Sequence, residues 1–142
     1  MIKDAVHELE QYIVEFPQLL QTLNRAELES KPSMDKWSKK EIVGHLIDSA
    51  HNNLTRFVVA QFQDNPIIQY DQDLWCRHNY YQGADLHNMI ILWEGLNRQL
   101  LYLRKGLSSD MWQRKANGNT LVFLATDYIA HFEHHLKQIK EQ

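Results

Sequence analysis

Histidines near the C-terminal end of the chain have the spacing of a metal site. His131 and His135 are four residues apart, so on a helix their rings stand on one face, where the ring nitrogens can converge on one ion. At 100° per residue, His135 falls inside the apolar stripe of this segment, and His131 lies at its edge, about 40° away. His134 points further out and is kept as a fallback ligand. The pair alone is short and common, and a core histidine with surface neighbours explains it more often than a metal does.

A third histidine, His45, also faces inward on a predicted helix. Ser49, Asn52 and Arg56 follow it at +4, +7 and +11, all within about 40° of one line. Such a polar row is costly to bury, so it indicates a polar cleft beside the core. The alternative is the solvated edge of an ordinary amphipathic helix. Asp48, three residues after His45, either orients a metal ligand or faces water.

Three neutral imidazoles are a common set of ligands for a catalytic zinc ion, because they leave a fourth position open. They also accept nickel, iron or cobalt, so the ligand type does not name the metal. Spacing within the sequence leaves open whether the segment of His45 and the segment of His131 and His135 are neighbours in the fold.

Four amphipathic helices are predicted to position these side chains. The first covers residues 4–23, with an interruption and a kink at Pro17, because proline removes a backbone donor and clashes with the preceding turn. The second begins after Ser38, which forms an S-x-x-E capping box with Glu41, and it continues to about Phe62.

The third helix is predicted over residues 85–106 and the fourth from 119 or 120 to about 140. About twenty residues connect the second helix to the third, enough to travel the length of a bundle and make those two helices parallel. A connection of this length usually has a function or a short helix of its own, which we predict over 73–79 with Trp75 as its anchor. The expected fold is all-α, an up-down-down-up four-helix bundle, in a single domain over 1–142.

Composition excludes several classes of protein. The 142 residues include only five Gly and three Pro, which argues against a barrel or sandwich with many tight turns. The net charge of −3 predicts no general attraction to nucleic acid or to an anionic membrane. Cys76 is the one cysteine, so no disulfide framework is possible. No apolar run approaches the roughly 20 residues that span a bilayer, and we expect a cytoplasmic protein.

Several segments together resemble the DinB/YfiT-like family. Residues 36–49, KWSKKEIVGHLIDS, are similar to its W-[ST] followed by H-L-x-D-S, and Asn52 or Asn53 with Arg56-Phe57 fill the later places. Residues 70–75, YDQDLW, resemble its Y-D-x-x-x-W segment. Residues 131–139, HFEHHLKQI, resemble its H-x-x-H-H-L-x-Q-I ending. The similarity runs in order from about Leu9 to Ile139.

The resemblance implies a four-helix bundle with a three-histidine metal site, in which His45, His131 and His135 are the ligands. It also implies one of two activities. YfiT-like members are known as metal-dependent hydrolases and are linked to S-transferases that use a low-molecular-weight thiol, bacillithiol. Zinc or nickel is the expected metal.

The function we predict from the sequence is thiol S-transfer. The metal would favour the thiolate of a low-molecular-weight thiol, and the thiolate would attack an electrophilic small molecule. Asp48 and Arg56 are the predicted catalytic residues, and Ser49, Asn52 and Arg56 the predicted substrate-binding residues. Arg56 would hold a carboxylate of the thiol by a bidentate pair; a salt bridge to the first or third helix is an equal alternative.

Two other functions are weighed against this one. A three-histidine zinc ion can generate hydroxide for hydrolysis, with Asp48, Glu133 or His134 as the base. None of these has a compelling position in the sequence, which favours S-transfer. The non-enzymatic alternative is a metal-stabilised module that pairs with itself, as a homodimer, or with another protein. Trp93 and Trp112 would then serve either an interface or the core.

Overall fold

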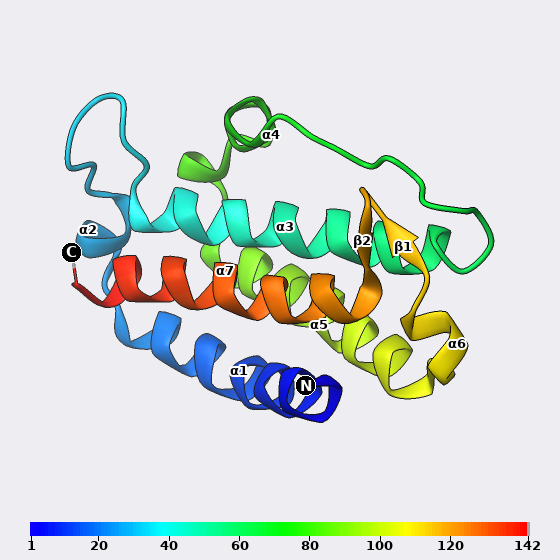
Figure 1. Ribbon diagram of the computed structural model, residues 1–142. Helices are drawn as coiled ribbons and strands as arrows, with labels where there is room; N and C mark the ends of the chain where they lie inside the picture. The colour runs from blue at the N-terminus through cyan, green and yellow to red at the C-terminus, as the bar shows by residue number, and fades with distance from the viewer. Residues whose placement is uncertain (142) are drawn as a thin grey trace.

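Four helices of equal length form the body of the protein in the computed structural model, which describes residues 1–141 (Figure 1). They are α1 (Ile2–Thr22), α3 (Lys39–Val59), α5 (Leu86–Gly106) and α7 (Leu121–Glu141). The shorter elements are α2 (Arg25–Glu29), α4 (Gln72–His78), the 3-10 helix η1 (Tyr81–Gly83), α6 (Ser109–Trp112), and the strands β1 (Lys115–Ala116) and β2 (Asn119–Thr120).

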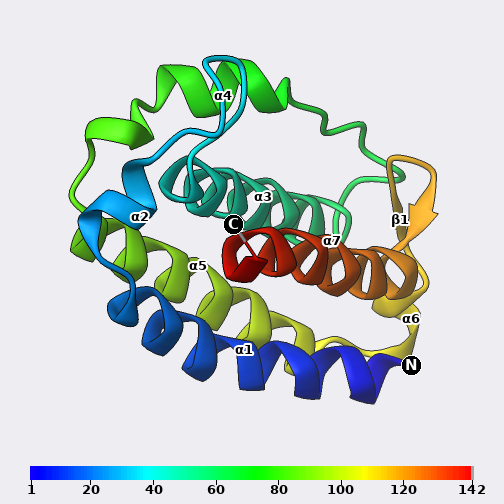
Figure 2. The ribbon, with the colours of Figure 1, turned by 90° about the vertical axis from the view of Figure 1, so that its left-hand side faces the viewer.

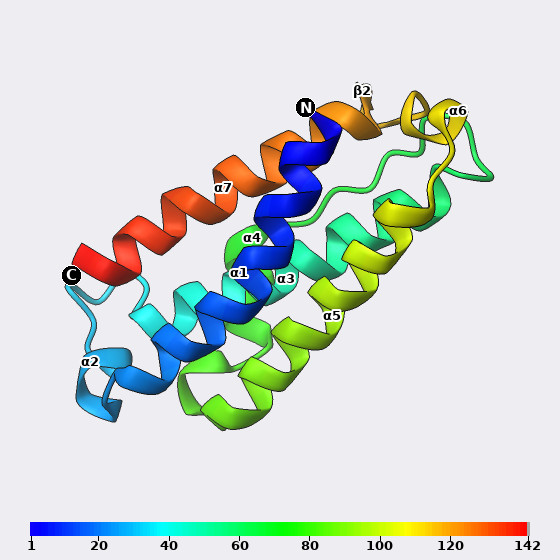
Figure 3. The same ribbon diagram turned by 90° about the horizontal axis from the view of Figure 1, so that it is seen from below.

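The long helices have the predicted up-down-down-up order. Helix α3 packs against α5 and α7, and α1 packs against the same two helices. Helices α3 and α5 run in one direction, and α1 and α7 run in the other (Figures 2 and 3). The connection between α3 and α5 returns along the outside of the bundle and contains α4, close to the predicted 73–79 (Figure 1). The antiparallel contact of α3 with α7 is the one that concerns the histidines.

Local hydrogen bonds begin these helices where the sequence predicts. The Ser38 Oγ accepts from the Glu41 backbone N–H at 3.1 Å, and the Glu41 carboxylate accepts from the Ser38 N–H at 3.0 Å, which confirms the capping box. Helix α3 ends at Val59, three residues before the predicted end. The predicted interruption at Pro17 is wrong, because α1 continues as one helix through this buried residue, whereas the predicted kink stays a prediction.

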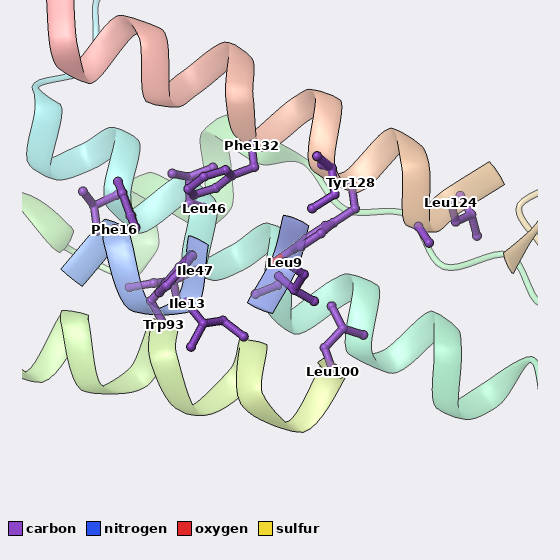
Figure 4. Packing of buried hydrophobic residues seen from close by; sticks show 14 of the residues in the cluster. Leu9, Ile13, Phe16, Leu46, Ile47, Trp93, Leu100, Leu124, Tyr128 and Phe132 are labelled. Carbon is purple, nitrogen blue, oxygen red and sulfur yellow. The ribbon is translucent and has the colours of Figure 1, made fainter. Parts of the chain in front are cut away.

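Aromatic and aliphatic side chains from all four long helices fill the core (Figure 4). The Phe16 ring lies 4.9 Å from the Trp93 ring and 5.0 Å from the Phe132 ring, measured between centroids. Trp93 and Trp112 are both buried, so they belong to the core and not to an exposed interface. Within residues 1–141, no helix is long and apolar enough to cross a membrane.

The two-stranded hairpin of β1 and β2 fastens the outer connection to the bundle. Asn117, at its tip, has a left-handed backbone with φ of 53°. Its side-chain carbonyl accepts from the Ile68 N–H at 2.7 Å, and its amide donates to the Ile68 carbonyl at 2.9 Å. The Asn117 side chain thus bonds to both main-chain groups of Ile68, as a neighbouring β-strand would. These two bonds help to hold residues 60–71 along α3.

Gly44 allows η1 to lie directly on α3. A Cβ atom built on Gly44 would stand 2.1 Å from a ring carbon of Tyr81, so only a hydrogen atom fits in this contact. Gly95, in the exposed middle of α5, has open space instead, because a Cβ atom added there would meet no other atom within 4 Å. The two glycines therefore have opposite expectations on substitution.

We expect Gly44→Ala to destabilise the protein by about 1–3 kcal/mol, because the Tyr81 ring must shift. Gly95→Ala is the matched control and should stabilise by about 0.5–1 kcal/mol, as alanine usually does inside a helix. Urea denaturation of both variants measures this difference. Equal stabilisation by the two substitutions would show that the Tyr81 contact imposes no constraint.

Candidate metal centre

Helices α3 and α7 bring three histidines together. His45 comes from α3, and His131 and His135 come from successive turns of α7. One ligand nitrogen from each ring lies within 4.8 Å of the other two. The Nε2 atoms of His45 and His131 are 3.0 Å apart, and the three ring centroids are separated by 4.6 to 4.9 Å.

Burial keeps these imidazoles uncharged. His45 is fully buried, and His131 and His135 are half-buried. Burial and the neighbouring histidines lower the pKa of His45 to about 3 and that of His131 to about 4. Burial also lowers the pKa of His135. At neutral pH each ring is therefore neutral and keeps one nitrogen without a proton, which is the form that binds a metal ion.

Two neighbouring side chains fix the orientation of the ligands. His135 donates from Nδ1 to the Gln138 side-chain carbonyl at 2.8 Å, which leaves its Nε2 without a proton, as is usual for metal-binding histidines. The Trp37 ring covers His45, with centroids 4.8 Å apart and planes inclined by 34°. The His45 Nδ1 is buried without a partner, so packing under Trp37, and not a hydrogen bond from Nδ1, holds this side of the ring.

The donor set fits a divalent transition metal. Bonds of 2.0–2.1 Å to a tetrahedral ion place the ligand nitrogens roughly 3.3 Å apart, close to the 3.0 Å between His45 and His131. Three neutral imidazoles suit zinc or nickel better than calcium or magnesium, which prefer oxygen ligands. His134 is exposed and is not part of the cluster.

Asp48 lies in the same helix but forms its hydrogen bonds away from the histidine cluster. Its Oδ1 accepts from the Tyr81 hydroxyl at 2.6 Å and from the Asn79 amide at 3.1 Å, and its Oδ2 is buried without a partner. Burial raises the pKa of Asp48 to about 6. The carboxylate thus joins α3 to the segment that follows α4.

The other three predicted polar residues remain on one side of α3. Asn52 is buried and donates to the Asp48 carbonyl, and Ser49 is also buried. Arg56 donates from Nε and Nη2 to the main-chain carbonyl of Ile68, at 3.1 and 2.8 Å. Arg56 therefore holds the outer connection, whereas Asn52 bonds within α3. The ion pairs found within residues 1–141 do not include Arg56, so the alternative of a salt bridge is wrong.

Sequence reasoning gave no role to Gln138, Trp37 or Tyr81. Gln138 stands inside the HFEHHLKQI segment, three residues after His135, so a hydrogen bond on the same helix face could have been expected. Trp37 stands directly before the cap of α3. Nothing in the sequence pairs Tyr81 with Asp48, because that contact depends on the path of the outer connection.

Comparison with known proteins gives the family. The model of the DinB superfamily matches residues 8–139. The chain belongs to the DinB superfamily. Among its relatives is the "Putative metal-dependent hydrolase BH0277" of Halalkalibacterium halodurans, 26% identical over 126 residues, which cover 84% of this chain and 73% of that protein. The "Putative metal-dependent hydrolase YfiT" of Bacillus subtilis is 22% identical over 143 residues, which cover 96% of this chain and 80% of that protein.

The solved structure of YfiT from Bacillus subtilis has the same fold as this DinB-superfamily chain. The two superpose with a TM-score of 0.90 at 22% identity, over 99% of this chain and 84% of YfiT. YfiT is described as "a probable metal-dependent hydrolase with an unusual four-helix bundle topology". This likeness confirms the predicted bundle.

We expect His45→Ala and His135→Ala to abolish stoichiometric metal binding, because each removes a nitrogen from the cluster. His134→Ala is the matched control on the same helix turn and should keep about one equivalent, since three neutral imidazoles complete the site. Elemental analysis of the untagged proteins measures the ratio. Equal loss in all three variants would contradict the ligand assignment.

The metal-free protein should lose stability as the pH falls from about 6.5 toward about 5. The unfolded chain binds protons on histidine near pH 6.5, whereas His45 and His131 stay neutral in the folded state down to about pH 3 and 4. Protons therefore favour unfolding in this window. Asp48 has the opposite effect on stability, because its pKa is raised in the folded state and protons therefore favour folding at this group. The three histidines of the cluster outnumber it, so the net effect of acid is destabilising.

Urea denaturation of the metal-free protein at pH 7 and pH 5.5 tests this pH dependence. His45→Phe should weaken it, because one buried imidazole is removed, whereas the exposed His134→Ala should leave it in place. Stability that is equal at the two pH values in the wild-type protein would contradict the buried neutral state of the cluster.

Proposed function

We propose that this protein is a metal-dependent hydrolase of small molecules, with zinc or nickel held by His45, His131 and His135. The observation that carries the proposal is the cluster itself, in which three neutral imidazoles converge while two of them keep part of their surface exposed. The names of the relatives, metal-dependent hydrolases, support the same class of reaction.

Each ligand has a defined task in this proposal. His45 forms the buried side of the site under Trp37, and His135 is oriented by Gln138. His131 and His135 border the accessible side, from which a substrate would approach. A divalent ion at such a site acts as a Lewis acid and lowers the pKa of water or of a thiol.

Hydrolysis also needs a group that accepts a proton, and contacts in the fold separate the three candidates. Asp48 is engaged by Tyr81. Glu133 accepts a hydrogen bond from the Tyr12 hydroxyl at 2.5 Å. His134 is exposed, its ring lies 5.0 Å from that of His135, and its Nε2 is 3.5 Å from the Gln138 amide. We therefore assign proton acceptance to the imidazole of His134, the candidate whose ring is exposed and makes only this long contact.

Thiol S-transfer is the second candidate, and one observation favours it. Both carboxylates near the site, those of Asp48 and Glu133, already have hydrogen-bond partners. A thiol has a far lower pKa than water, so its activation needs less help from a base. In this case Ser49, Asn52 and the remaining Nη1 of Arg56 would bind the low-molecular-weight thiol, and the second substrate would be an electrophile.

His134→Ala separates the two reactions. If the enzyme is a hydrolase, the variant should keep its metal but lose roughly 10²-fold in kcat on small esters and amides, as is typical when a general base is removed. If it is an S-transferase, conjugation of bacillithiol or cysteine to 1-chloro-2,4-dinitrobenzene should proceed at a similar rate in both proteins. His135→Ala is the inactive control in either assay.

The assays use the zinc-loaded and nickel-loaded proteins at equal metal content. Hydrolysis that needs His135 and depends on His134 supports the proposal. Thiol conjugation without hydrolysis supports the second candidate. A protein that binds one metal ion and turns over neither class of substrate would contradict both and leave a metal-stabilised interaction module.

A further inference from the structure

Arg104, in the last turn of α5, is a buried cation without a hydrogen-bond acceptor. Its side chain is 1% exposed, and its Nε, Nη1 and Nη2 atoms find no partner within residues 1–141. Burial lowers the pKa of Arg104 to about 10, so the guanidinium keeps its charge at neutral pH. Buried charges in proteins are normally paired or hydrogen-bonded, so these N–H groups indicate a missing acceptor.

Aromatic rings cover the guanidinium of Arg104, so such an acceptor would approach along its edge. The Phe57 ring covers the guanidinium at 4.4 Å, and the Tyr128 ring lies 5.1 Å from it. Neighbouring polar groups bond to one another: the Tyr128 hydroxyl donates to the Asn97 carbonyl at 2.5 Å, and the Asn97 amide donates to the Trp93 main chain at 2.8 Å. A planar acceptor with two oxygens fits a guanidinium approached along its edge.

Arg104 contributes to the lining of an open pocket of about 350 Å³ between α1, the end of α5 and α6. Ile2, Val6, Leu107 and Trp112 give this pocket an apolar surface. It lies at the end of the bundle near α6, whereas His131 and His135 belong to the half of α7 nearer its C-terminus (Figure 1). The pocket is therefore separate from the three-histidine site.

The charges around the pocket favour an anion. Lys3, His7 and Lys105 line it together with Arg104. Glu10 is the carboxylate of the lining, and it is engaged by Lys105 at 2.5 Å. Arg104 and Lys3 are thus left as cations without an ion pair in the described part of the chain.

The first turn of α1 provides a route to the guanidinium. The guanidinium nitrogens of Arg104 are shielded from solvent, and Ile2 and Val6, from the first turn of α1, line the pocket. Ile2 and Val6 also pack against the core, so binding at the guanidinium requires this turn to move aside.

We propose that this pocket binds a small carboxylate with an apolar tail. Its two oxygens accept hydrogen bonds from the edge of Arg104, and its tail packs against Val6, Leu107 and Trp112. The ligand supplies the acceptor that the core lacks, and its binding is independent of the metal.

Calorimetric titration of the full-length protein with sodium octanoate tests the proposal, with 1-octanol as the neutral probe of the same tail. We expect saturable binding of one octanoate with a Kd of about 1 mM or tighter, and binding of octanol at least about tenfold weaker because it lacks the carboxylate. Backbone amide signals of residues 2–7 and 104–112 should shift in NMR spectra. His135→Ala should bind octanoate as the wild-type protein does.

Arg104→Met is the decisive variant, because replacing an unpaired buried charge by an apolar side chain of similar length should leave Tm unchanged or raise it. It should weaken octanoate binding at least about tenfold. Arg104→Lys keeps the charge without the planar fork and should weaken binding similarly, which also decides the question if Arg104→Met does not fold. Lys3→Met is the control at the mouth of the pocket. It should change the octanoate Kd by less than about threefold, because the charge of Lys3 is exposed and screened by salt.

Three results would overturn the proposal. The first is no saturable octanoate binding by the wild-type protein. The second is octanoate binding by Arg104→Met or Arg104→Lys that equals the wild-type binding. The third is octanol binding as tight as that of octanoate, which would reduce the pocket to an apolar surface.

Discussion

The close contact of three uncharged imidazoles between α3 and α7 is the constraint on which the rest of the structure depends. Protonated rings at centroid distances of 4.6 to 4.9 Å would repel one another, and burial prevents this by disfavouring the charged form. His45 is fully buried because α3 has neighbours on every side: α5 and α7 in the bundle, and α4 with η1 outside it. The long connection between α3 and α5 therefore supports the histidine cluster indirectly, by covering the helix that carries its most buried member, His45.

Three residues of α3 hold the outer connection against the helix. Gly44 leaves room for the Tyr81 ring next to the helix backbone, and Asp48 accepts a hydrogen bond from the hydroxyl of the same tyrosine. Arg56 donates hydrogen bonds to the Ile68 carbonyl. Of the polar row after His45, Arg56 attaches the connection, whereas Asn52 donates to the Asp48 carbonyl within α3. The covering connection explains why a helix with so many polar residues is buried over most of its length.

Features that depend on short-range patterns were predictable from the sequence. The apolar stripes, the Ser38–Glu41 box and the inward direction of His131 and His135 follow from helical periodicity and hydrogen bonds over three or four residues. The contacts of Arg56 and Asp48 were not predictable. A main-chain carbonyl such as that of Ile68 carries no signature in the sequence, and Tyr81 is 33 residues from its partner Asp48. Both contacts depend on how the connection folds back over α3. The missing break at Pro17 has a simpler reason: proline removes one backbone hydrogen bond, and the packing of the surrounding core residues of α1 retains the helix.

The location of a bound ion tests the central claim most directly. A crystal structure of the zinc-loaded protein, with anomalous diffraction recorded on both sides of the zinc absorption edge, shows where the metal lies without reference to activity. We predict one strong anomalous peak within about 2.0–2.1 Å of a ring nitrogen of each of His45, His131 and His135, with no bond to His134. A peak bound by other residues, or a fully loaded protein in which one of these three histidines turns away from the ion, would contradict the account.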